Sequence, residues 1–434
     1  MELSVNAGDV HEVETAWSGR NCVKGKAQST WCGSSRVTGS SLLAPPQRLP
    51  YSGHLSRASK MDELVKESIA TVEQRKKTSV PWTIDEPHDQ PYHRFENGKW
   101  EATTPKTEHA DPAGTLKPSD KLALYTWNID FMLPYPDSRM RAAIHHLETL
   151  CRLHPPTMHP VIFLQECLAT DLTLLASSPW IQANFHLTDL TPASWASAHY
   201  GTTTLLSNRL SPSACFRIHY SNSEQQRDVL VLDIPLSLST TTTTTTAAKP
   251  LLLRLCNTHL ESLPASPPLR PHQLALCAQH MQNLKTLHAS ILAGDLNAIQ
   301  SFDAHLPSAH GLKDAYLELG GQEDDAEGGH TWGQQASTAL REKFGTSRMD
   351  KVLFCGDGVV CEEFERFGGG VEVEDAGERR QIVGLGFGKG WITDHLGVKA
   401  VGGTGQVAHT SLGTRKLGYG LRGGTTDEYV GLSR

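Results

Sequence analysis

The sequence predicts an α/β fold in which two packed β-sheets carry helices on their outer faces, preceded by a disordered N-terminal extension. Two observations lead to this prediction. From residue 119 to residue 403, apolar runs of strand length first alternate with amphipathic helix patterns and then follow one another closely. Before residue 119, the composition is mostly polar. Alternating and then crowded strands favour a layered sandwich of two sheets.

The N-terminal extension, residues 1–118, is expected to be mostly disordered because residues 1–58 are rich in Ser, Gly and Thr and have no apolar period. One helix is expected over 59–77, where apolar residues share one face. Residues 78–118 are rich in Pro and charge and predict an extended linker. Four aromatic residues could pin that linker to the domain: Trp82, Tyr92, Phe95 and Trp100.

Within the domain, each strand is predicted from an apolar run and each helix from an apolar stripe. The predicted strands are 122–129, 161–166, 200–208, 228–236, 251–260, 290–297, 348–355 and 396–401, and the predicted helices are 139–153 and 271–287. The threonine run 240–246 predicts a surface hairpin loop, and 320–329 predicts an acidic loop. Residues 404–434 predict a flexible C-terminal tail.

Composition excludes several classes of protein. Lys and Arg number 40 against 47 Asp and Glu, giving a net charge of −7, so the chain is not a broadly basic binder of nucleic acid or membranes. A nucleic-acid enzyme of this composition must concentrate its positive charge in a groove. The 9 cysteines form no CxxC pair, which indicates free thiols in a reducing compartment. No apolar run approaches the roughly 18 residues of a membrane helix, so we expect a soluble intracellular protein that is not secreted.

The informative pattern is the position of polar residues at strand ends. Five predicted strands end in polar residues and a sixth opens with them, and side chains at strand ends face the mouth of a sandwich, where sites are built. The segments are TWNID (126–130), LQE (164–166), THLE (258–261), GDLN (294–297), RMD (348–350) and TDH (393–395). Taken singly, Asn128 or Asp295 would be an ordinary turn residue, but the ordered set predicts a catalytic site.

This ordered set resembles the endonuclease/exonuclease/phosphatase superfamily over residues 119–403, which implies a metal-dependent, four-layer α/β sandwich. Within it, TWNID, HLES (259–262), RMDKVLF and QRDVLVLDI (226–234) look most like the tyrosyl-DNA phosphodiesterase 2 (TDP2) family. That family removes tyrosine from 5′ DNA phosphates left by stalled type II topoisomerases. The resemblance implies a monomeric DNA-repair hydrolase that acts on DNA 5′ ends with a protein or tyrosine adduct. It also implies a location in the nucleus, with the cytoplasm as a second compartment.

The chemistry of phosphodiester hydrolysis assigns roles to these residues. It needs a cation on the non-bridging oxygens, an aligned water and a donor for the leaving oxygen. One Mg²⁺ or Mn²⁺ ion is expected, because carboxylates suit such ions. The resemblance makes Glu166 its primary ligand and gives Asp394 a secondary role. Asp130 is the second ligand candidate, since it lies two residues beyond Asn128 on the same strand face.

Six residues are expected to be catalytic. Asp295 is the candidate general base, with Asn297 beside it to position water or phosphate. Asn128 would orient the substrate or a metal-bound water. His395, held by Asp350, would bear on the phosphate oxygens as a cation. His259 is the second phosphate donor. For Asp350, pairing with Arg348 or Lys351 at the surface is the alternative.

Substrate contacts are expected from four residues: Arg227, Trp332, Tyr200 and Glu261. Arg227 precedes a strand and could hold a phosphate, or could simply be a solvated surface residue. Trp332 could stack on a terminal base and Tyr200 could touch phosphate, but packing or loop anchoring explains either aromatic equally well.

Three positions depart from the family pattern: Phe131 stands where the family has Gly, Leu296 where it has Thr, and Thr393 where it has Ser. Phe131 is bulky and predicts a reshaped wall at the DNA entry.

Two alternatives to the tyrosyl-DNA activity stay open. One is another phosphodiesterase of this fold, such as an abasic endonuclease, a deadenylase or a lipid phosphodiesterase. The other is a non-catalytic module that binds DNA ends.

Overall fold

The computed structural model describes residues 66–404, with gaps at 68–69, 73, 106–113, 238–250, 265–266, 283–286 and 357. All described residues belong to one compact unit, Ser52–Arg434. The expectations for residues 1–58, the threonine run 240–246 and the tail from 405 onward fall outside the described residues.

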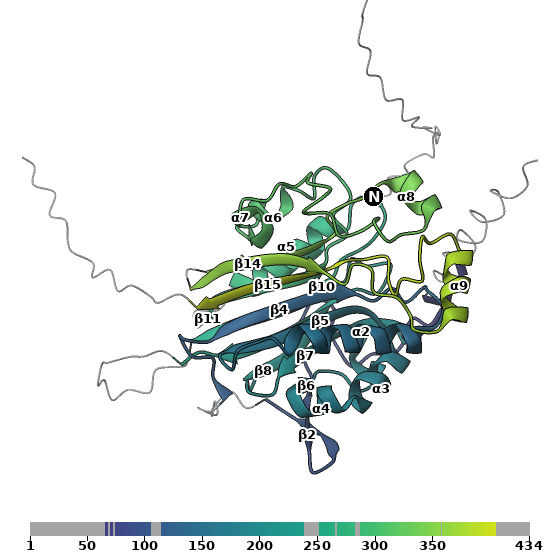
Figure 1. Cartoon of the computed structure of the whole chain (residues 1–434). Coiled ribbons are helices and arrows are strands. Elements are labelled where there is room, and N and C mark those ends of the chain that lie inside the picture. Colours follow the sequence, from purple (N-terminus) through teal and green to yellow (C-terminus); the bar gives the residue numbers. More distant parts are fainter. Residues whose placement is uncertain are drawn as a thin grey trace, which may run out of the picture. The chain divides into compact units, whose positions relative to one another are not determined.

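Two β-sheets form the centre of the molecule (Figure 1). The larger sheet has the strand order β14 (Val359–Phe367), β15 (Gly397–Thr404), β4 (Lys121–Asn128), β5 (Met158–Leu168), β7 (Tyr200–Ser207), β6 (Phe185–Leu187), β2 (Tyr92–Glu96), β3 (Lys99–Thr103). The smaller sheet has the order β1 (His88–Asp89), β8 (Ala214–His219), β9 (Asp228–Pro235), β10 (Leu252–His259), β11 (Leu287–Asp295), β13 (Asp350–Cys355), β12 (Lys313–Asp314).

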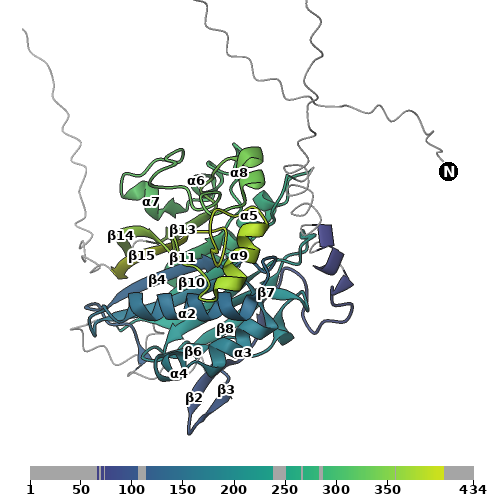
Figure 2. The same cartoon turned by 45° about the vertical axis from the view of Figure 1, so that its right-hand side comes forward.

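Helices cover the outer faces of both sheets (Figures 1 and 2). They are α2 (Pro136–Cys151), α3 (Ala169–Ser177), α4 (Pro179–Asn184), α5 (Arg270–Gln282), α6 (Leu306–Ala309), α7 (Ala315–Glu318), α8 (Thr338–Phe344) and α9 (Ala376–Gly384). Leu124 and Phe163 of one sheet pack with Leu232 of the other in the central core. The opposite faces pack against helices, as Trp127 does with Met140 of α2. The predicted four-layer α/β sandwich is therefore confirmed.

Each sheet contains one parallel pair of strands joined by a helix. Strands β4 and β5 run parallel and are connected by α2, while β10 and β11 run parallel and are connected by α5. The other neighbours in both sheets pair antiparallel, so the sheets are mixed. Since the carboxyl ends of parallel strands meet at one edge, each pair presents two strand ends together.

The prediction of an extended linker over 78–118 is wrong for the described part of that range. Residues 92–103 form the β2–β3 hairpin, which joins the larger sheet through a pairing of His93 with Leu187. Trp82 stacks on His219 with ring centroids 3.8 Å apart, and Leu116 is buried in the central core. The polar composition hid this structure because edge strands bury few side chains. The folded unit therefore begins well before residue 119.

The helix expected over 59–77 is seen only in part. Residues 66–67, 70–72 and 74 are helical, and Arg75 begins a turn, so the helix ends earlier than predicted. Val72 on its apolar face is buried. Strand β8 and strand β14 lie in stretches for which the sequence predicted no strand. Within the described residues, no helix is long and apolar enough to span a membrane.

Candidate active site

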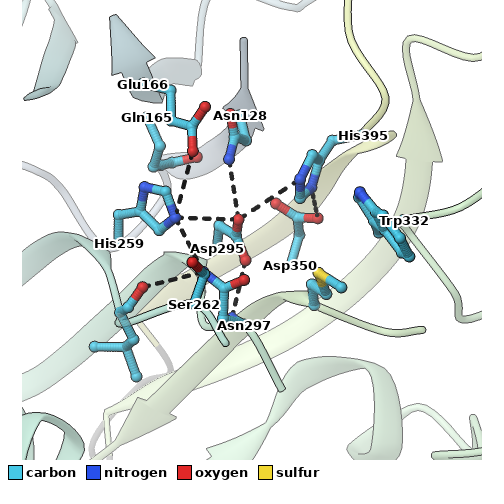
Figure 3. A network of polar contacts seen from close by, with 12 residues as sticks. Asn128, Gln165, Glu166, His259, Ser262, Asp295, Asn297, Trp332, Asp350 and His395 are labelled. Atoms are coloured by element: carbon cyan, nitrogen blue, oxygen red, sulfur yellow. Dashed lines mark hydrogen bonds and ion pairs between the residues drawn. The ribbon is translucent and has the colours of Figure 1, made fainter. Parts of the chain in front are cut away.

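The strand ends predicted from the sequence meet at one edge of the sandwich (Figure 3). Asn128 ends β4, His259 ends β10 and Asp295 ends β11. Asp350 begins β13 directly opposite Asp295, because these strands are antiparallel. Hydrogen bonds and ion pairs connect these residues across the two sheets, so the site is built jointly by both.

Three site residues adopt a left-handed backbone. Asp130, Glu166 and Asn297 have φ values of 58°, 59° and 47°. Glu166 also lies where the β5–β7 register shifts between Leu164 and Cys167, which is a β-bulge. A left-handed residue other than glycine costs on the order of 1–3 kcal/mol, and such strain concentrates at functional sites. Asp and Asn tolerate this region better than other residues, so the strain falls mainly on Glu166.

Asp295 lies at the centre of the network and is almost fully buried. Its Oδ2 accepts a hydrogen bond from Asn128 Nδ2 at 3.0 Å and lies 3.3 Å from His259 Nε2. Its Oδ1 accepts from the backbone N–H of Asn297 at 2.9 Å. Burial alone would raise the pKa of Asp295, but the neighbouring His395 and His259 hold it well below the ordinary value. Asp295 is thus a carboxylate anion throughout the physiological pH range.

His259 is held from behind by an arginine. Its Nδ1 lies 2.5 Å from Arg227 Nη1, and a guanidinium can only donate, so Nδ1 must accept. The ring therefore carries its proton on Nε2, which faces Asp295 and lies 3.8 Å from Glu166 Oε1. Asn297 Nδ2 lies 3.0 Å from the same nitrogen. Asn297 Nδ2 is itself a donor and donates to Leu260 O, so it does not accept the Nε2–H, which is directed at Asp295 Oδ2.

His395 is held from behind by a carboxylate. Its Nδ1 donates to Asp350 Oδ2 at 2.9 Å, and its Nε2 lies 3.7 Å from both Asp295 Oδ2 and Asp394 Oδ1. Burial would lower the pKa of His395, but Asp350, Asp295 and Asp394 hold it well above the ordinary value. The expected pairing of Asp350 with His395 is thus present in the structure. Arg348 and Lys351 instead pair with Asp314 and Glu323.

Three predicted metal ligands, all acidic, lie beside this network, although their ligand atoms do not all come within 4.8 Å of one another. Asp130, Glu166 and Asp394 are all buried. Burial, then the nearby charges of Asp394 and Glu166, raise the pKa of Asp130 well above its ordinary value. Buried acids that repel one another are stabilised by a bound cation, and hard divalent ions prefer carboxylate oxygens. The donor set therefore fits a Mg²⁺ or Mn²⁺ ion.

A second cluster meets the spacing for a metal. In the described part of the chain, ligand atoms of Asp295, Asp350 and His395 lie within 4.8 Å of one another. However, His395 donates Nδ1–H to Asp350, and the raised pKa keeps its ring protonated. A metal ligand must be a neutral imidazole. The described residues thus contain two candidate metal sites: this cluster, in which His395 is protonated, and the three buried acids.

Arg227 and Tyr200 are buried beside the site, next to Phe131. Arg227 is buried, which excludes the solvated alternative, and its guanidinium lies 5.1 Å from the Tyr200 ring centroid. Tyr200 stacks on Phe131 with centroids 4.5 Å apart and donates its hydroxyl hydrogen to Gln225 O at 2.6 Å. The backbone N–H of Phe131 donates to Glu166 Oε2 at 3.0 Å. The residue that departs from the family pattern is thus in direct contact with a candidate metal ligand.

Trp332 and Glu261 act as anchors in this structure. Trp332 is only 9% exposed, and its Nε1 donates to Asp394 Oδ2 at 2.7 Å. Glu261 accepts hydrogen bonds from the backbone of Glu224 and Gln225 and from Ser223 Oγ. Its oxygens are therefore engaged with the loop that leads to Arg227. The loop-anchoring alternative explains Trp332, and Glu261 positions the Arg227 loop.

Two further residues of the site were not predicted. Arg139 of α2 is buried and donates to the carbonyls of Ile129 and Ile392, so it fixes the segments that carry Asp130 and Asp394. An arginine on an amphipathic helix gives no sequence signal for this role. Gln165 donates to Thr126 and Asn257 and so bridges the sheets below the site. The LQE segment contained that residue, but only its Glu was singled out.

The acidic loop 320–329 is partly neutralised at its base. Glu323 forms ion pairs with Arg348 and Lys351, which flank Met349 and Asp350 on the chain. The carboxylate of Asp325 accepts backbone N–H groups of Glu327 and Gly328 within its own turn. The loop therefore closes the β13 end of the site through ion pairs.

Comparisons with known proteins extend these observations. The model of the Endonuclease/Exonuclease/phosphatase family matches residues 125–395. Among solved structures, truncated TDP2 of Caenorhabditis elegans is similar at 22% identity and a TM-score of 0.47, over 65% of this chain and 98% of that chain. D. rerio TDP2 complexed with single strand DNA product is similar at 18% identity and a TM-score of 0.46, over 65% and 99%. A search of curated protein sequences finds no match.

Proposed function

The chain belongs to the endonuclease/exonuclease/phosphatase family, and from this premise we propose that it is a divalent-metal-dependent phosphodiesterase that hydrolyses 5′-phosphotyrosyl–DNA bonds. The observation that carries the proposal is the arrangement of Asp295 between two histidines, next to three buried acids. Such an arrangement offers an anionic acceptor, two N–H donors and a cation site within one edge of the fold.

In this proposal Asp295 accepts a hydrogen bond from the attacking water and takes up its proton. Asn128 and the backbone N–H of Asn297 hold the carboxylate in one orientation, so its free lone pairs point in a fixed direction. A base with a strongly lowered pKa is weak, so much of its contribution is orientation of the water. Asn297, through its side-chain amide, positions the phosphate.

The two histidines would bind the non-bridging phosphate oxygens from two sides. His395 brings a positive charge, and His259 brings an Nε2–H donor. Donors fixed in a buried site stabilise the charge that develops in the transition state. Glu166, Asp130 and Asp394 would hold Mg²⁺ or Mn²⁺, which supplies Lewis-acid stabilisation of the phosphoryl oxygens when bound.

The substrate class rests on sequence motifs. TWNID, HLES and QRDVLVLDI resemble the TDP2 family, and Arg227 within the last motif is held against His259 beside the site. We therefore propose DNA 5′ ends with a tyrosine or peptide adduct as substrate, cleaved by a monomeric enzyme in the nucleus. Tyr200 would support Arg227 through its ring.

The test is cleavage of a single-stranded oligonucleotide that carries a 5′-phosphotyrosine, measured with Mg²⁺, with Mn²⁺ and with EDTA. Parallel reactions contain a 3′-phosphotyrosyl, an abasic and a poly(A) substrate. Metal-dependent release of tyrosine from the 5′ substrate alone is the expected result. Preferential cleavage of another substrate would place the chain with a different phosphodiesterase of this fold. Absence of cleavage of all four would favour the DNA-end binding module.

A second experiment tests the metal site without relying on turnover. Thermal unfolding of the wild type is expected to shift to higher temperature with Mg²⁺, because a ligand that binds the folded state stabilises it. Glu166→Ala should abolish most of that shift. A shift of wild-type size in Glu166→Ala would mean that the metal binds elsewhere.

A further inference from the structure

The described N-terminal segment is docked beside the active site. Val72 O accepts a hydrogen bond from Gln226 Nε2 at 3.2 Å, next to Arg227 on the chain. Arg75 O accepts from the backbone N–H of Ala198 at 3.1 Å. The segment therefore contacts both the loop before β7 and the loop before β9.

Lys77 is the main anchor of this segment. Its ammonium group donates to three backbone carbonyls, those of Pro192, Ala193 and Trp195, at 2.6, 3.0 and 2.7 Å. An ammonium group has three donors, so none is left for a ligand. The neighbouring Arg75 and Lys76 are exposed. The anchor thus fixes the backbone while two adjacent cations face solvent.

A continuous row of side chains connects this segment to the catalytic histidine. The row consists of Arg75, His199, Phe131, Tyr200, Arg227 and His259. Arg75 Nη1 lies 3.0 Å from His199 Nδ1, and the His199 ring meets Phe131 edge-on at 5.4 Å. Beyond Phe131, the Tyr200 stack and Arg227 lead to His259. Three aromatic rings therefore connect the exposed Arg75 with the buried Arg227, which contacts His259.

The charge of this surface is unusual for the protein. The chain is acidic overall, with a net charge of −7, yet Arg75, Lys76 and Lys77 are consecutive. In the part of the chain that the structure describes, neither Arg75 nor Lys76 forms an ion pair with a carboxylate. Other exposed lysines do, as Lys99 does with Glu101 and Lys121 with Glu362. Among the described residues, the Arg75 guanidinium thus contacts only the uncharged side of His199 and Lys76 has no carboxylate partner, so their positive charges are not neutralised there.

We propose that Arg75, Lys76 and Phe131 form a binding wall for a single-stranded nucleic acid that enters the active site. The two cations would contact backbone phosphates, and the half-buried Phe131 ring would carry a base. Positive charges beside an aromatic ring on which a base can stack are the recognition elements of single-strand grooves. The phosphate backbone is a repeated anion, which suits two adjacent exposed cations better than an uncharged peptide does. This inference rests on the proposed function, because it assumes that the site acts on nucleic acid.

The experiment measures binding of a fluorescent 5′-phosphorylated single-stranded oligonucleotide by anisotropy in EDTA, across a salt series. The double variant Arg75→Gln/Lys76→Gln should bind about tenfold more weakly at low salt, and its slope of log K against log salt should shrink by about 0.7 per lost phosphate contact. Phe131→Leu should weaken binding at least about fivefold with the salt slope unchanged.

The matched control is Lys99→Gln/Lys121→Gln. It removes the same charge from exposed positions, and Lys121 begins β4 at the end opposite to Asn128. Its affinity should stay within about twofold of the wild type, because distant exposed charges are screened. Equal weakening in the control and in Arg75→Gln/Lys76→Gln would overturn the proposal, as would wild-type protein that does not bind the oligonucleotide.

A third measurement separates nucleic acid from peptide. If Arg75→Gln/Lys76→Gln weakens binding of a tyrosine-containing peptide adduct but not of the oligonucleotide, the wall binds the peptide part of the substrate. The proposal is then overturned. Binding does not depend on cleavage. A protein that fails to cleave the 5′-tyrosyl substrate but shows the expected binding pattern would refute the proposed function and support this wall.

Discussion

Two histidines flank Asp295, and the group behind each ring gives them opposite properties. His259 Nε2 lies 3.3 Å and His395 Nε2 lies 3.7 Å from the same Oδ2 atom, so their distances to the carboxylate are similar. Behind His259 is the guanidinium of Arg227, and behind His395 is the carboxylate of Asp350. The first ring must accept at Nδ1, whereas the second donates there.

The comparison teaches that the residue behind a ring decides what the ring can do. The guanidinium behind His259 can only donate, so Nδ1 accepts and Nε2 carries the N–H. An anion behind Nδ1 favours the second proton, so His395 is a cation. One site thus obtains two kinds of donor from the same residue type. The following predictions test that division, from the largest expected effect to the smallest.

Asp295→Asn removes the carboxylate that both rings share. We expect kcat to fall by about a thousandfold or more, because the attacking water loses its acceptor and the rings lose their common partner. The measurement is single-turnover cleavage with Mg²⁺. Oligonucleotide binding and the unfolding transition serve as controls. Turnover close to wild type would contradict the role of Asp295.

Asp350→Asn removes the anion that stabilises the protonated form of His395 and leaves the contacts of His259 in place. The raised pKa keeps the active cation present at neutral pH, and activity is lost as pH rises through that pKa. Without the anion, the alkaline limb of kcat/KM should move at least about one pH unit lower. Profiles between about pH 6 and 10 would show this shift. If the alkaline limb of the kcat/KM profile does not move, its pKa belongs to a group other than His395.

Arg227→Met removes the donor behind His259 without adding another. We expect kcat to fall about 10- to 100-fold, since the ring can now rotate or place its proton on Nδ1. Nitrogen NMR of the imidazole groups should show the Nε2–H tautomer of His259 in the wild type and a mixture in the variant. The alkaline limb assigned to His395 should stay in place. A wild-type tautomer signal in the variant would show that Arg227 is dispensable for His259.

Trp332→Phe tests the hydrogen bond from Trp332 to Asp394, the residue next to His395. The ring remains, but the hydrogen bond to Asp394 is lost, so unfolding should become easier by about 1–3 kcal/mol. We expect kcat to fall by no more than about tenfold. Urea unfolding and oligonucleotide binding are the measurements. Weaker binding with unchanged stability would restore the base-stacking role.

Much of the fold could be predicted because apolar periodicity is a local signal. The eight predicted strands and two predicted helices over 122–401 all correspond to observed elements. Strands such as β2 and β3 were missed since their exposed, polar positions resemble a linker. Periodicity also gave no sign that Val72, Arg75 and Lys77 dock on the domain, because their hydrogen bonds go to polar groups far away in the sequence.

The sequence could predict which residues form the candidate site, but not all of the contacts that they make. Asn128, His259, Asp295, Asp350 and His395 come together as their strand-end positions implied. The sequence could not show that Glu261 faces the Arg227 loop, because its partners lie on another strand connection. Nor could it show that Arg139 is buried, because a helix pattern does not specify what covers each face.

The sequence alone thus determined which polar residues end which strands, since alternation and strand length are properties of neighbouring residues. Tertiary structure decided which nitrogen of His259 carries the proton and the charge of His395. It also decided the left-handed backbone of Asp130, Glu166 and Asn297 and the contact of Phe131 with Tyr200. Each of these depends on groups brought from distant parts of the chain. Electrostatic energy and packing act across space, so they appear only when the two sheets meet.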